Sequence, residues 1–396
     1  MSPTPAGQVR PLLGGTAEAA VRCVLDHLPD AIFGTGPALF LTDPQQPGRP
    51  PAGVPAGVAA VLTTSGSTSG EGRRVALDGA ALRASAQATA DHLAGPGHWV
   101  SCLPVHHVAG FQVLVRSVVA GSEPVVLDTS DGFRAADLAA AVARLDPGLP
   151  GYLSLVPTQL SRVLADDNAV RAVRTLAAVL VGGARTAPAV LRAAREAGLP
   201  VVTTYGMTET GGGCVYDGRP LPGVEVEVDE EDRIWLSGPV LARGYLGDEA
   251  ATSEAFRLRE GRRWLRTADR GELTEGLLTV LGRLDDTIIS GGLNIAPGAV
   301  ESVVAELPGA GDVVVVGVPD EHWGSLVTAV VTGGDLGLSR VRTAVGRQLG
   351  RASAPRALVR LPELPLRGPG KIDRRAAAAT AAARLAAAAP GTEQLS

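Results

Sequence analysis

Residues 152–164, YLSLVPTQLSRVL, contain the pattern that decides the fold. A short apolar run typical of a buried strand is followed at once by a segment with helical spacing. The alternation continues on both sides, with strands expected at 58–63, 99–103, 124–127, 176–181 and 200–204 and helices at 77–93, 108–119, 135–145 and 187–197. Strands that alternate with helices predict a mostly parallel sheet with helices on both faces. The expected fold class is therefore α/β.

The rest of the chain is expected to depart from this alternation. Residues 1–57 are expected to be rich in loops, with a Pro/Gly cluster at 44–57. From residue 224 short strands indicate a β-rich subdomain, at 224–228, 233–236, 264–266, 271–273 and 278–281. After Asp285 a small α+β unit is expected, with helices at 299–306 and 339–349, strands at 313–318, 327–332 and 357–360, an alanine-rich helix at 374–389 and a frayed end at 391–396. The sequence thus predicts a large domain, residues 1–284, and a small mobile α+β domain, residues 285–396.

Composition excludes several classes of function. The net charge is −5 and no basic tract stands out, which gives nucleic-acid binding little support. The three cysteines, at 23, 102 and 214, form no CxxC pair, which favours reduced thiols over a disulfide framework or a zinc site. No signal peptide is evident, and no apolar stretch reaches the roughly 18 residues of a membrane span. We expect a cytoplasmic protein without a membrane span.

One basic residue is unusual in type. Lys371 is the only lysine among 36 lysines and arginines. Arginine replaces lysine readily at the surface, whereas a site that needs a compact charge on a flexible stem keeps lysine. Chance survival of one lysine is the alternative. Lys371 lies in the segment LPLRGPGKIDRR, residues 364–375, whose Gly/Pro-rich loop precedes the last helix, so a domain motion could carry it into a site.

A small-residue segment follows the first expected strand: TTSGSTSGEGRR, residues 63–74. Small and hydroxyl-bearing residues let the backbone approach a phosphate and donate hydrogen bonds to it. The GxxxxGK[ST] pattern is absent, which disfavours a P-loop kinase or GTPase. The alternative is a flexible Ser/Gly linker.

Two further segments follow later strands. TTYGMTETGGG, residues 203–213, places an aromatic ring, a hydroxyl and a carboxylate at a strand end, where open α/β sheets bind ligands. These groups could stack a base, bind phosphate and hold Mg²⁺; the alternative is a glycine-rich turn with a core tyrosine. In RTADRG, residues 266–271, Asp269 could accept two ribose hydroxyls, or it could cap a turn.

A last segment, LGRLDDTIISGGLNIAP, residues 281–297, suits a hinge and a narrow channel.

Taken in this order, the five segments resemble the adenylate-forming superfamily of acyl-CoA synthetases, peptide-synthetase adenylation domains and luciferases, over residues 58–375. Within it the sequence is most similar to 2-succinylbenzoate–CoA ligases of menaquinone biosynthesis, on the segments LPVHHVAG (103–110), SLVPTQL (154–160) and GGGCVYDG (211–218). There are two departures. The Pro-Lys pair usual after the phosphate loop is replaced by Glu71 and Gly72, so Arg73 or Arg74 would supply the charge. Much of the usual first subdomain is also missing, which leaves open a homodimer.

The resemblance implies two half-reactions in one site. A substrate carboxylate first attacks the α-phosphate of ATP, and the thiol of CoA then displaces AMP from the acyl-adenylate. The implied catalytic residues are Lys371, which bridges carboxylate and α-phosphate, Glu209, which holds Mg²⁺, and His107, which lies at the acyl pocket or is merely a satisfied core histidine. The implied nucleotide-binding residues are Thr64, Ser65, Gly66, Ser67 and Thr68 for phosphate, Gly182, Gly183, Ala184 and Tyr205 for adenine, Gly206 and Thr208 beside them, and Asp269 with Arg283 for ribose. Asp285 would be the hinge, Ser290, Gly291 and Gly292 would line the CoA tunnel, and Gly211, Gly212 and Gly213 would leave room for a flat acyl group.

Two other functions remain open at this point. One is a stand-alone adenylation enzyme that loads an aryl or amino acid onto a carrier protein, which could share every motif. The other is a non-catalytic nucleotide-binding relic of a ligase. The presence of Glu209, Asp269, Arg283 and Lys371 together argues against the relic.

Overall fold

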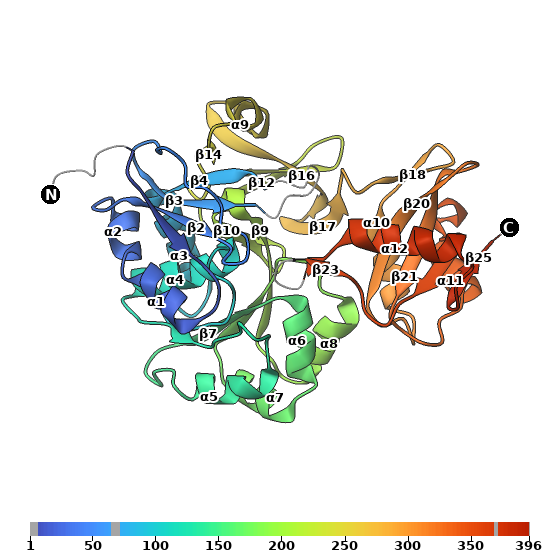
Figure 1. The fold of residues 1–396 in the computed structure, drawn as a ribbon, viewed down its shortest axis with the longest axis horizontal. Coiled ribbons are helices and arrows are strands. Elements are labelled where there is room, and N and C mark those ends of the chain that lie inside the picture. The colour runs from blue at the N-terminus through green and yellow to red at the C-terminus, as the bar shows by residue number, and fades with distance from the viewer. Residues whose placement is uncertain (1–6, 65–71, 368–370, 396) are drawn as a thin grey trace.

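The computed structural model describes residues 7–64, 72–367 and 371–395 (Figure 1). Its centre is a seven-stranded sheet in the order β11-β10-β9-β8-β7-β5-β6. The strands from β6 to β9 are parallel, and β10 and β11 add an antiparallel edge. The members are β5 (His98–Ser101), β6 (Val125–Val126), β7 (Gly151–Leu155), β8 (Ala178–Val181), β9 (Val201–Met207), β10 (Gly212–Tyr216) and β11 (Arg219–Pro220). The predicted α/β class is confirmed.

Helices cover both faces of this sheet (Figure 1). On one face, α3 (Gly79–His92) and α4 (Val108–Ala120) bury Leu82 and Phe111 in a core shared with the next sheet. The other face has a second core, covered by α5 (Leu138–Val142), α6 (Pro157–Leu164), α7 (Asp167–Val173) and α8 (Pro188–Glu196). α7 was not predicted, and the start of the helix expected at 77–93 is instead the end of strand β4.

The second sheet has the order β1-β2-β3-β4-β14 and overturns the prediction for the N-terminus. Its strands are β1 (Val9–Leu13), β2 (Ala38–Thr42), β3 (Val58–Thr63), β4 (Arg74–Asp78) and β14 (Gly244–Tyr245), and α1 (Glu18–Leu25) and α2 (Leu28–Phe33) lie between β1 and β2. Residues 9–42 are therefore not rich in loops. The reason is packing, because all five residues of β2 are buried. Only the Pro/Gly cluster behaves largely as expected, with a single isolated bridge beside it.

A third sheet forms the predicted β-rich subdomain, in the order β12-β13-β16-β15 with β17 also on β16. Its elements are β12 (Glu225–Val228), β13 (Arg233–Ser237), α9 (Glu249–Ala255), β15 (Phe256–Arg259), β16 (Arg262–Thr274) and β17 (Leu277–Arg283). The separate strands expected at 264–266 and 271–273 are one strand of 13 residues. Its pairing with β17 has an irregularity between Arg270 and Gly271, and the strand continues through it.

The C-terminal part stands at one end of the molecule and contains the sheet β20-β21-β22-β25 (Figure 1). Its strands are β20 (Val313–Asp320), β21 (Gly324–Val331), β22 (Ala357–Arg360) and β25 (Thr392–Gln394), and its helices are α10 (Pro297–Ala305), α11 (Leu338–Leu349) and α12 (Arg374–Ala386). Two hairpins accompany this sheet: β18 (Ile288–Ser290) with β19 (Leu293–Ile295) precedes it in sequence, and β23 (Leu366–Arg367) with β24 (Lys371–Ile372) lies between β22 and β25.

The expectation of a frayed C-terminus is wrong. β25 pairs antiparallel with β22, and Glu393 accepts hydrogen bonds from Arg360 (2.6 Å) and from the backbone of Leu338 (2.8 Å). β25 provides hydrogen-bond partners for the backbone groups at the edge of β22, which would otherwise lack them. The helix before it ends at Ala386, three residues earlier than expected.

The buried apolar residues divide near the end of β17. The clusters that lie before this point extend to Leu278, and the two clusters after it begin at Ile288 and share no residue with them. Among the described residues, no helix is long and apolar enough to cross a membrane.

Candidate active site

Tyr205, Asp269 and Arg283 lie together beside the end of β9. The hydroxyl of Tyr205 donates to Oδ2 of Asp269 at 2.8 Å, and Nη1 of Arg283 is 3.8 Å from Oδ1 of the same carboxylate. Asp269 and Arg283 are register partners on β16 and β17, so the sheet holds them side by side. Burial raises the pKa of the Asp269 carboxyl, and the Tyr205 hydroxyl and Arg283 offset part of this rise. The arrangement offers a half-buried acceptor beside an aromatic ring.

Arg283 also connects this cluster to the predicted hinge. Its Nε and Nη2 each donate to the carboxylate of Asp285 at 2.7 Å, and this bidentate pairing is the main reason why the pKa of Arg283 is raised. Bidentate charge-assisted bonds are geometrically specific. Asp285 is thus fixed to the same guanidinium that faces Asp269.

Glu209 lies in a short 3₁₀ turn, Thr208–Thr210, directly after β9. The hydroxyl of Tyr245, on β14, donates to Oε1 of Glu209 at 2.8 Å. Burial raises the pKa of Glu209, while the Tyr245 hydrogen bond and the charges of Arg283 and Arg73 lower it. Thr210 holds the turn, since its Oγ1 donates to the backbone oxygen of Gly212 at 2.7 Å. The half-buried carboxylate of Glu209 therefore lies near Arg283, which belongs to the cluster with Tyr205 and Asp269.

No group of three or more acidic, histidine or cysteine side chains that could hold a metal occurs in the described parts of the chain. Glu209 supplies one hard oxygen donor, and Mg²⁺ is commonly held by one or two carboxylates together with substrate phosphates. The residues therefore fit a Mg²⁺ ion that arrives with a nucleotide, and do not fit an all-protein metal cage.

The ends of the predicted phosphate loop are closed by Thr64 and Arg73. The backbone nitrogen of Thr64 donates to the oxygen of Arg73, and the nitrogen of Arg73 donates to Oγ1 of Thr64, both at 2.9 Å. Ser65, Gly66, Ser67 and Thr68 lie outside the described residues.

The structure separates the two arginines that follow this loop. The guanidinium of Arg73 lies over the ring of Tyr245, 5.1 Å from its centroid, and its positive charge acts to lower the pKa of Glu209. Arg74 turns the other way, where it donates to the backbone oxygen of Arg49 at 2.6 Å and lies over Phe40. Of the two candidates for the missing lysine, Arg73 is the one that faces the site.

Gly182, Gly183 and Ala184 follow β8, and Gly182 lies against Thr204 on β9. A side chain at Gly182 would meet Oγ1 of Thr204 at 2.1 Å, which explains why glycine is needed there. The next residue, Arg185, donates to the backbone oxygen of Gly298 at 2.6 Å, at the start of α10. Gly206, also on β9, lies against Gly212 on the paired strand β10. The loop thus joins the end of the central sheet to the C-terminal part.

Of the three predicted acyl-pocket glycines, Gly211 and Gly212 lie near α4, whereas Gly213 lies against Tyr216 and Thr204. His107 is the residue before this helix, and Gln112 on it donates to the backbone oxygen of Gly211. The Cβ position of Gly212 is 3.1 Å from Gln112 and 3.8 Å from Val108. His106 is committed elsewhere, because its Nδ1 accepts from the backbone of Gly15 at 3.0 Å. Gly211 and Gly212 therefore lie against α4, the helix that begins directly after His107.

Ser290, Gly291 and Gly292 lie apart from these residues, on the β18–β19 hairpin of the C-terminal part. The nitrogen of Gly291 donates to the oxygen of Trp323 at 2.9 Å. Ser290, Gly291 and Trp323 line a cavity together with Arg356, whose guanidinium stacks 3.5 Å from the Trp323 centroid. Within the described residues, no hydrogen bond or ion pair joins this hairpin to Asp269 or Glu209.

Lys371 is the first residue of β24 rather than part of a loop, and residues 368–370 and the Lys371 side chain lie outside the described structure. Arg374 anchors the segment that follows. It forms a bidentate pair with Glu301 on α10 and an ion pair with Asp286 at 3.2 Å. The lysine segment is thereby tied to the residue next to Asp285.

Sequence reasoning missed Tyr245 and Gln112. No motif marks either residue. Tyr245 reaches Glu209 because β14 pairs with β4, which is more than 160 residues away in sequence. Such a pairing leaves no local signal.

The comparisons with known proteins agree with this geometry. The family described as "AMP-binding enzyme" matches residues 9–246, and the "AMP-binding enzyme C-terminal domain" matches residues 299–371. A probable 2-succinylbenzoate–CoA ligase of Mycobacterium tuberculosis is 41% identical over 372 residues, which cover 91% of this chain and 95% of that protein. A 2-succinylbenzoate–CoA ligase of Lactococcus lactis is 29% identical over 335 residues, which cover 80% of this chain and 70% of the relative.

A solved structure has the same fold. The o-succinylbenzoate CoA synthetase of Bacillus subtilis, in complex with its acyl-adenylate intermediate, superimposes with a TM-score of 0.71. The two sequences are 24% identical, and the match covers 93% of this chain and 87% of the other.

Proposed function

This chain belongs to the AMP-binding enzyme family, and from that premise we propose that it is the ligase that joins 2-succinylbenzoate to CoA through an acyl-adenylate. The observation that carries the proposal is the cluster of Tyr205, Asp269 and Arg283 beside Glu209. It offers an aromatic ring, an acceptor for ribose hydroxyls and a carboxylate for a phosphate-bound metal within one site. The identity of 41% to a relative of that name supports the choice of acid.

In the first half-reaction an oxygen of the substrate carboxylate bonds to the α-phosphorus of ATP, and pyrophosphate leaves with the electrons of the broken P–O bond. Asp269 would accept the ribose hydroxyls, with its own orientation held by Tyr205 and Arg283. Thr64 and Arg73 would orient the phosphates from the base of their loop. Mg²⁺, held by Glu209 and phosphate oxygens, would neutralise charge on the departing pyrophosphate. Lys371 would place its ammonium between the carboxylate and the α-phosphate, so catalysis comes from positioning and electrostatics.

In the second half-reaction the thiolate of CoA bonds to the acyl carbon, and AMP leaves with the former carboxylate oxygen. We place the domain boundary after residue 284 and the hinge at Asp285, between the two sets of buried clusters. Rotation about a few residues at the end of an element is a known switching mode. It would withdraw Lys371 and bring Ser290, Gly291 and Gly292 to the acyl-adenylate. Their present separation from Glu209 supports such a movement.

The acyl pocket would lie between His107 and the three glycines 211–213. Small residues leave room there for a flat aromatic ring, and His107 at the start of α4 would lie near the reacting carboxylate. A histidine at this position can donate to a carboxylate oxygen or accept from a donor, according to its protonation.

Exchange of radiolabelled pyrophosphate into ATP tests the proposal, because it requires reversible formation of an acyl-adenylate. The acids to compare are 2-succinylbenzoate, benzoate, a medium-chain fatty acid and an amino acid. Exchange should be fastest with 2-succinylbenzoate, by at least tenfold in kcat/KM. Equal or faster exchange with another acid would refute the proposed substrate while leaving the ligase chemistry intact.

The acceptor is tested separately. With 2-succinylbenzoyl-AMP supplied, CoA should give a thioester, whereas a phosphopantetheinylated carrier protein should not. Acylation of the carrier in preference to CoA would support the alternative function as an adenylation enzyme.

A further inference from the structure

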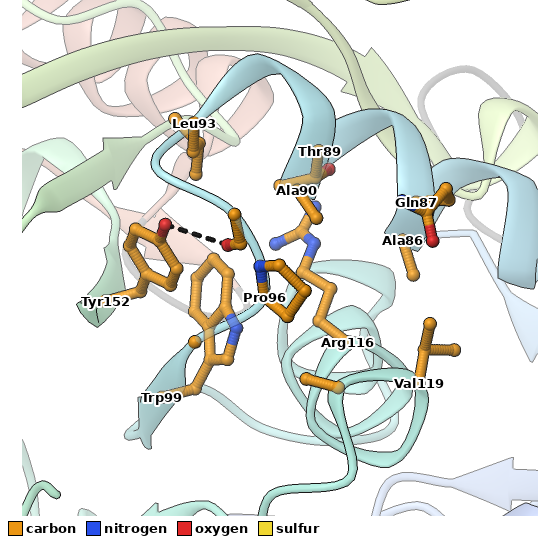
Figure 2. Close-up of a pocket in the computed structure, with 13 residues that line it drawn as sticks. Ala86, Gln87, Thr89, Ala90, Leu93, Pro96, Trp99, Arg116, Val119 and Tyr152 are labelled. Atoms are coloured by element: carbon orange, nitrogen blue, oxygen red, sulfur yellow. Dashed lines mark hydrogen bonds between the residues drawn. The ribbon is translucent and has the colours of Figure 1, made fainter. Parts of the chain in front are cut away.

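A second cavity lies at the opposite edge of the central sheet from the candidate active site (Figure 2). It is lined by Trp99 and Tyr152, near the starts of β5 and β7, and by parts of α3 and α4. The strands β5, β7, β8 and β9 are parallel, and Tyr205 lies near the other end of β9, with Glu209 just beyond that end. None of the residues predicted for catalysis or nucleotide binding lines this cavity.

A buried cation borders the cavity without an acidic partner. Arg116 on α4 is only 6% exposed, and no described carboxylate lies within ion-pair distance of it. Its Nη2 donates to the hydroxyl of Tyr216 at 3.1 Å, and its Nε has no acceptor among the described residues. Arginine remains charged in proteins. Because a buried charge is stable only when it is paired, this guanidinium offers a place for an anion.

The other walls of the cavity are mostly apolar. Figure 2 shows Pro96 and the indole of Trp99 beside the guanidinium, with Leu93 and Val119 at the sides. The guanidinium is 5.0 Å from the Trp99 ring centroid. Thr89 adds a hydroxyl, which is bonded to Tyr216 at 3.1 Å. The guanidinium of Arg116 thus has a polar neighbour, the hydroxyl of Tyr216, and an aromatic neighbour, the ring of Trp99. These surroundings suit a carboxylate that carries a small apolar group.

We propose that this cavity binds a small organic carboxylate, whose oxygens accept hydrogen bonds from Arg116 and whose apolar part packs against Trp99 and Pro96. Tyr216 separates this site from the proposed acyl pocket, since its ring is 3.0 Å from the Cβ position of Gly213. The inference does not rest on the proposed function, because the carboxylate is a ligand in its own right and not the acid that is activated.

Binding to the full-length protein can be measured by isothermal titration calorimetry with benzoate, acetate and chloride. Benzoate should bind with a stoichiometry that includes one site dependent on Arg116. Arg116→Gln keeps a donor for Tyr216 and removes the charge, so it should weaken that site at least tenfold. Arg83→Gln is the matched control on α3, because Arg83 also lacks a carboxylate partner in the described structure but bonds to the backbone of Ile32, and it should leave binding unchanged.

A second variant keeps the test valid if Arg116→Gln does not fold. Ala90→Leu fills the cavity from α3 and leaves Arg116 in place, so it too should abolish the site. Binding that persists in both variants would locate benzoate elsewhere, in the acyl pocket for example, and would overturn the proposal. Absence of benzoate binding to the parent protein, or chloride binding as tight as benzoate binding, would also overturn it.

Discussion

At Glu209, one phenolic hydroxyl influences how the carboxylate titrates. Burial raises the pKa of this group, and the hydrogen bond from Tyr245 opposes the rise by stabilising the charged form. Tyr245→Phe removes that bond and keeps the ring under Arg73, so the pKa of Glu209 should rise further. Metal binding needs the carboxylate, so activity is lost as pH falls through this pKa. The acid limb of the pH profile for pyrophosphate exchange should therefore move to higher pH, with a loss of about fivefold near neutrality. An acid limb that stays in place or moves to lower pH would contradict this role.

Arg73 and Arg74 provide a matched pair on adjacent residues. Arg73 faces Glu209 and the phosphate loop, whereas Arg74 is bonded to the backbone of Arg49. We expect Arg73→Gln to lower kcat/KM for ATP by roughly 10- to 100-fold, as the loss of a charge-assisted hydrogen bond would. Arg74→Gln should change it by less than about threefold, on the scale of an exposed contact. Steady-state kinetics with varied ATP decide the matter, and equal losses in the two variants would remove Arg73 from the site.

Lys371 is expected to act in the first half-reaction only. Lys371→Ala should slow adenylation by roughly 10²- to 10³-fold, the scale of removing a group that stabilises charge in a transition state. Thioester formation from supplied acyl-AMP should remain within a few-fold of the parent rate. Lys371→Arg should not restore adenylation, because a planar guanidinium does not replace a compact ammonium. Single-turnover measurements of each half-reaction give the answer, and equal loss in both would refute the two-conformation mechanism.

Much of the site could be predicted from residue types, and its remaining members could not. Tyr205 and Asp269 belong to separate segments of the sequence, both predicted to bind the nucleotide, and they form a hydrogen bond with each other. Their identities suffice because each belongs to a short motif with its own chemical signature. Tyr245 has no such signature, since a long-range strand pairing alone brings it to Glu209. Arg73 and Arg74 were equivalent in the sequence, and only their opposite orientations distinguish them.

At the scale of elements, prediction succeeded where one face or one run was apolar. β3, α4 and β22 have apolar runs bounded by polar or turn residues, and their ends agree with expectation to within a residue. The elements between residues 9 and 42 were missed because they are short and adjoin a Pro/Gly cluster, although β2 is wholly buried. β25 was missed because its three residues are polar, and its order depends on pairing with β22.

The β18–β19 hairpin carries a prediction of its own. Gly292 has φ +79°, and a side chain there would project into space with no atom within 4 Å. Gly292→Leu should therefore obstruct the proposed CoA tunnel, with thioester formation reduced at least tenfold and pyrophosphate exchange kept. Gly247→Leu is the matched control, because Gly247 has φ +77° and equally open surroundings in the loop before α9. Loss of exchange in Gly292→Leu, or equal loss of transfer in both variants, would refute the tunnel assignment.

At the scale of the whole molecule, the short N-terminal region still completes the second sheet. β1 and β2 extend β3 and β4, and the family match begins at residue 9, well before the first motif. The match to the relative of Mycobacterium tuberculosis covers 95% of that protein's length. The sequence predicts a boundary between the two parts after residue 284. It could not indicate Arg185 and Arg374, whose contacts with Gly298 and Asp286 depend on how the two parts meet.

The most direct test of the central claim follows one oxygen atom. If the enzyme forms an acyl-adenylate, the carboxylate oxygen that attacks the α-phosphorus must leave with AMP when CoA bonds to the acyl carbon. With 2-succinylbenzoate labelled with ¹⁸O in its carboxylates, mass spectrometry of the products after complete turnover in the presence of CoA should find one labelled oxygen in each AMP and none in pyrophosphate. Label in orthophosphate with formation of ADP, or AMP that contains no label, would contradict the account.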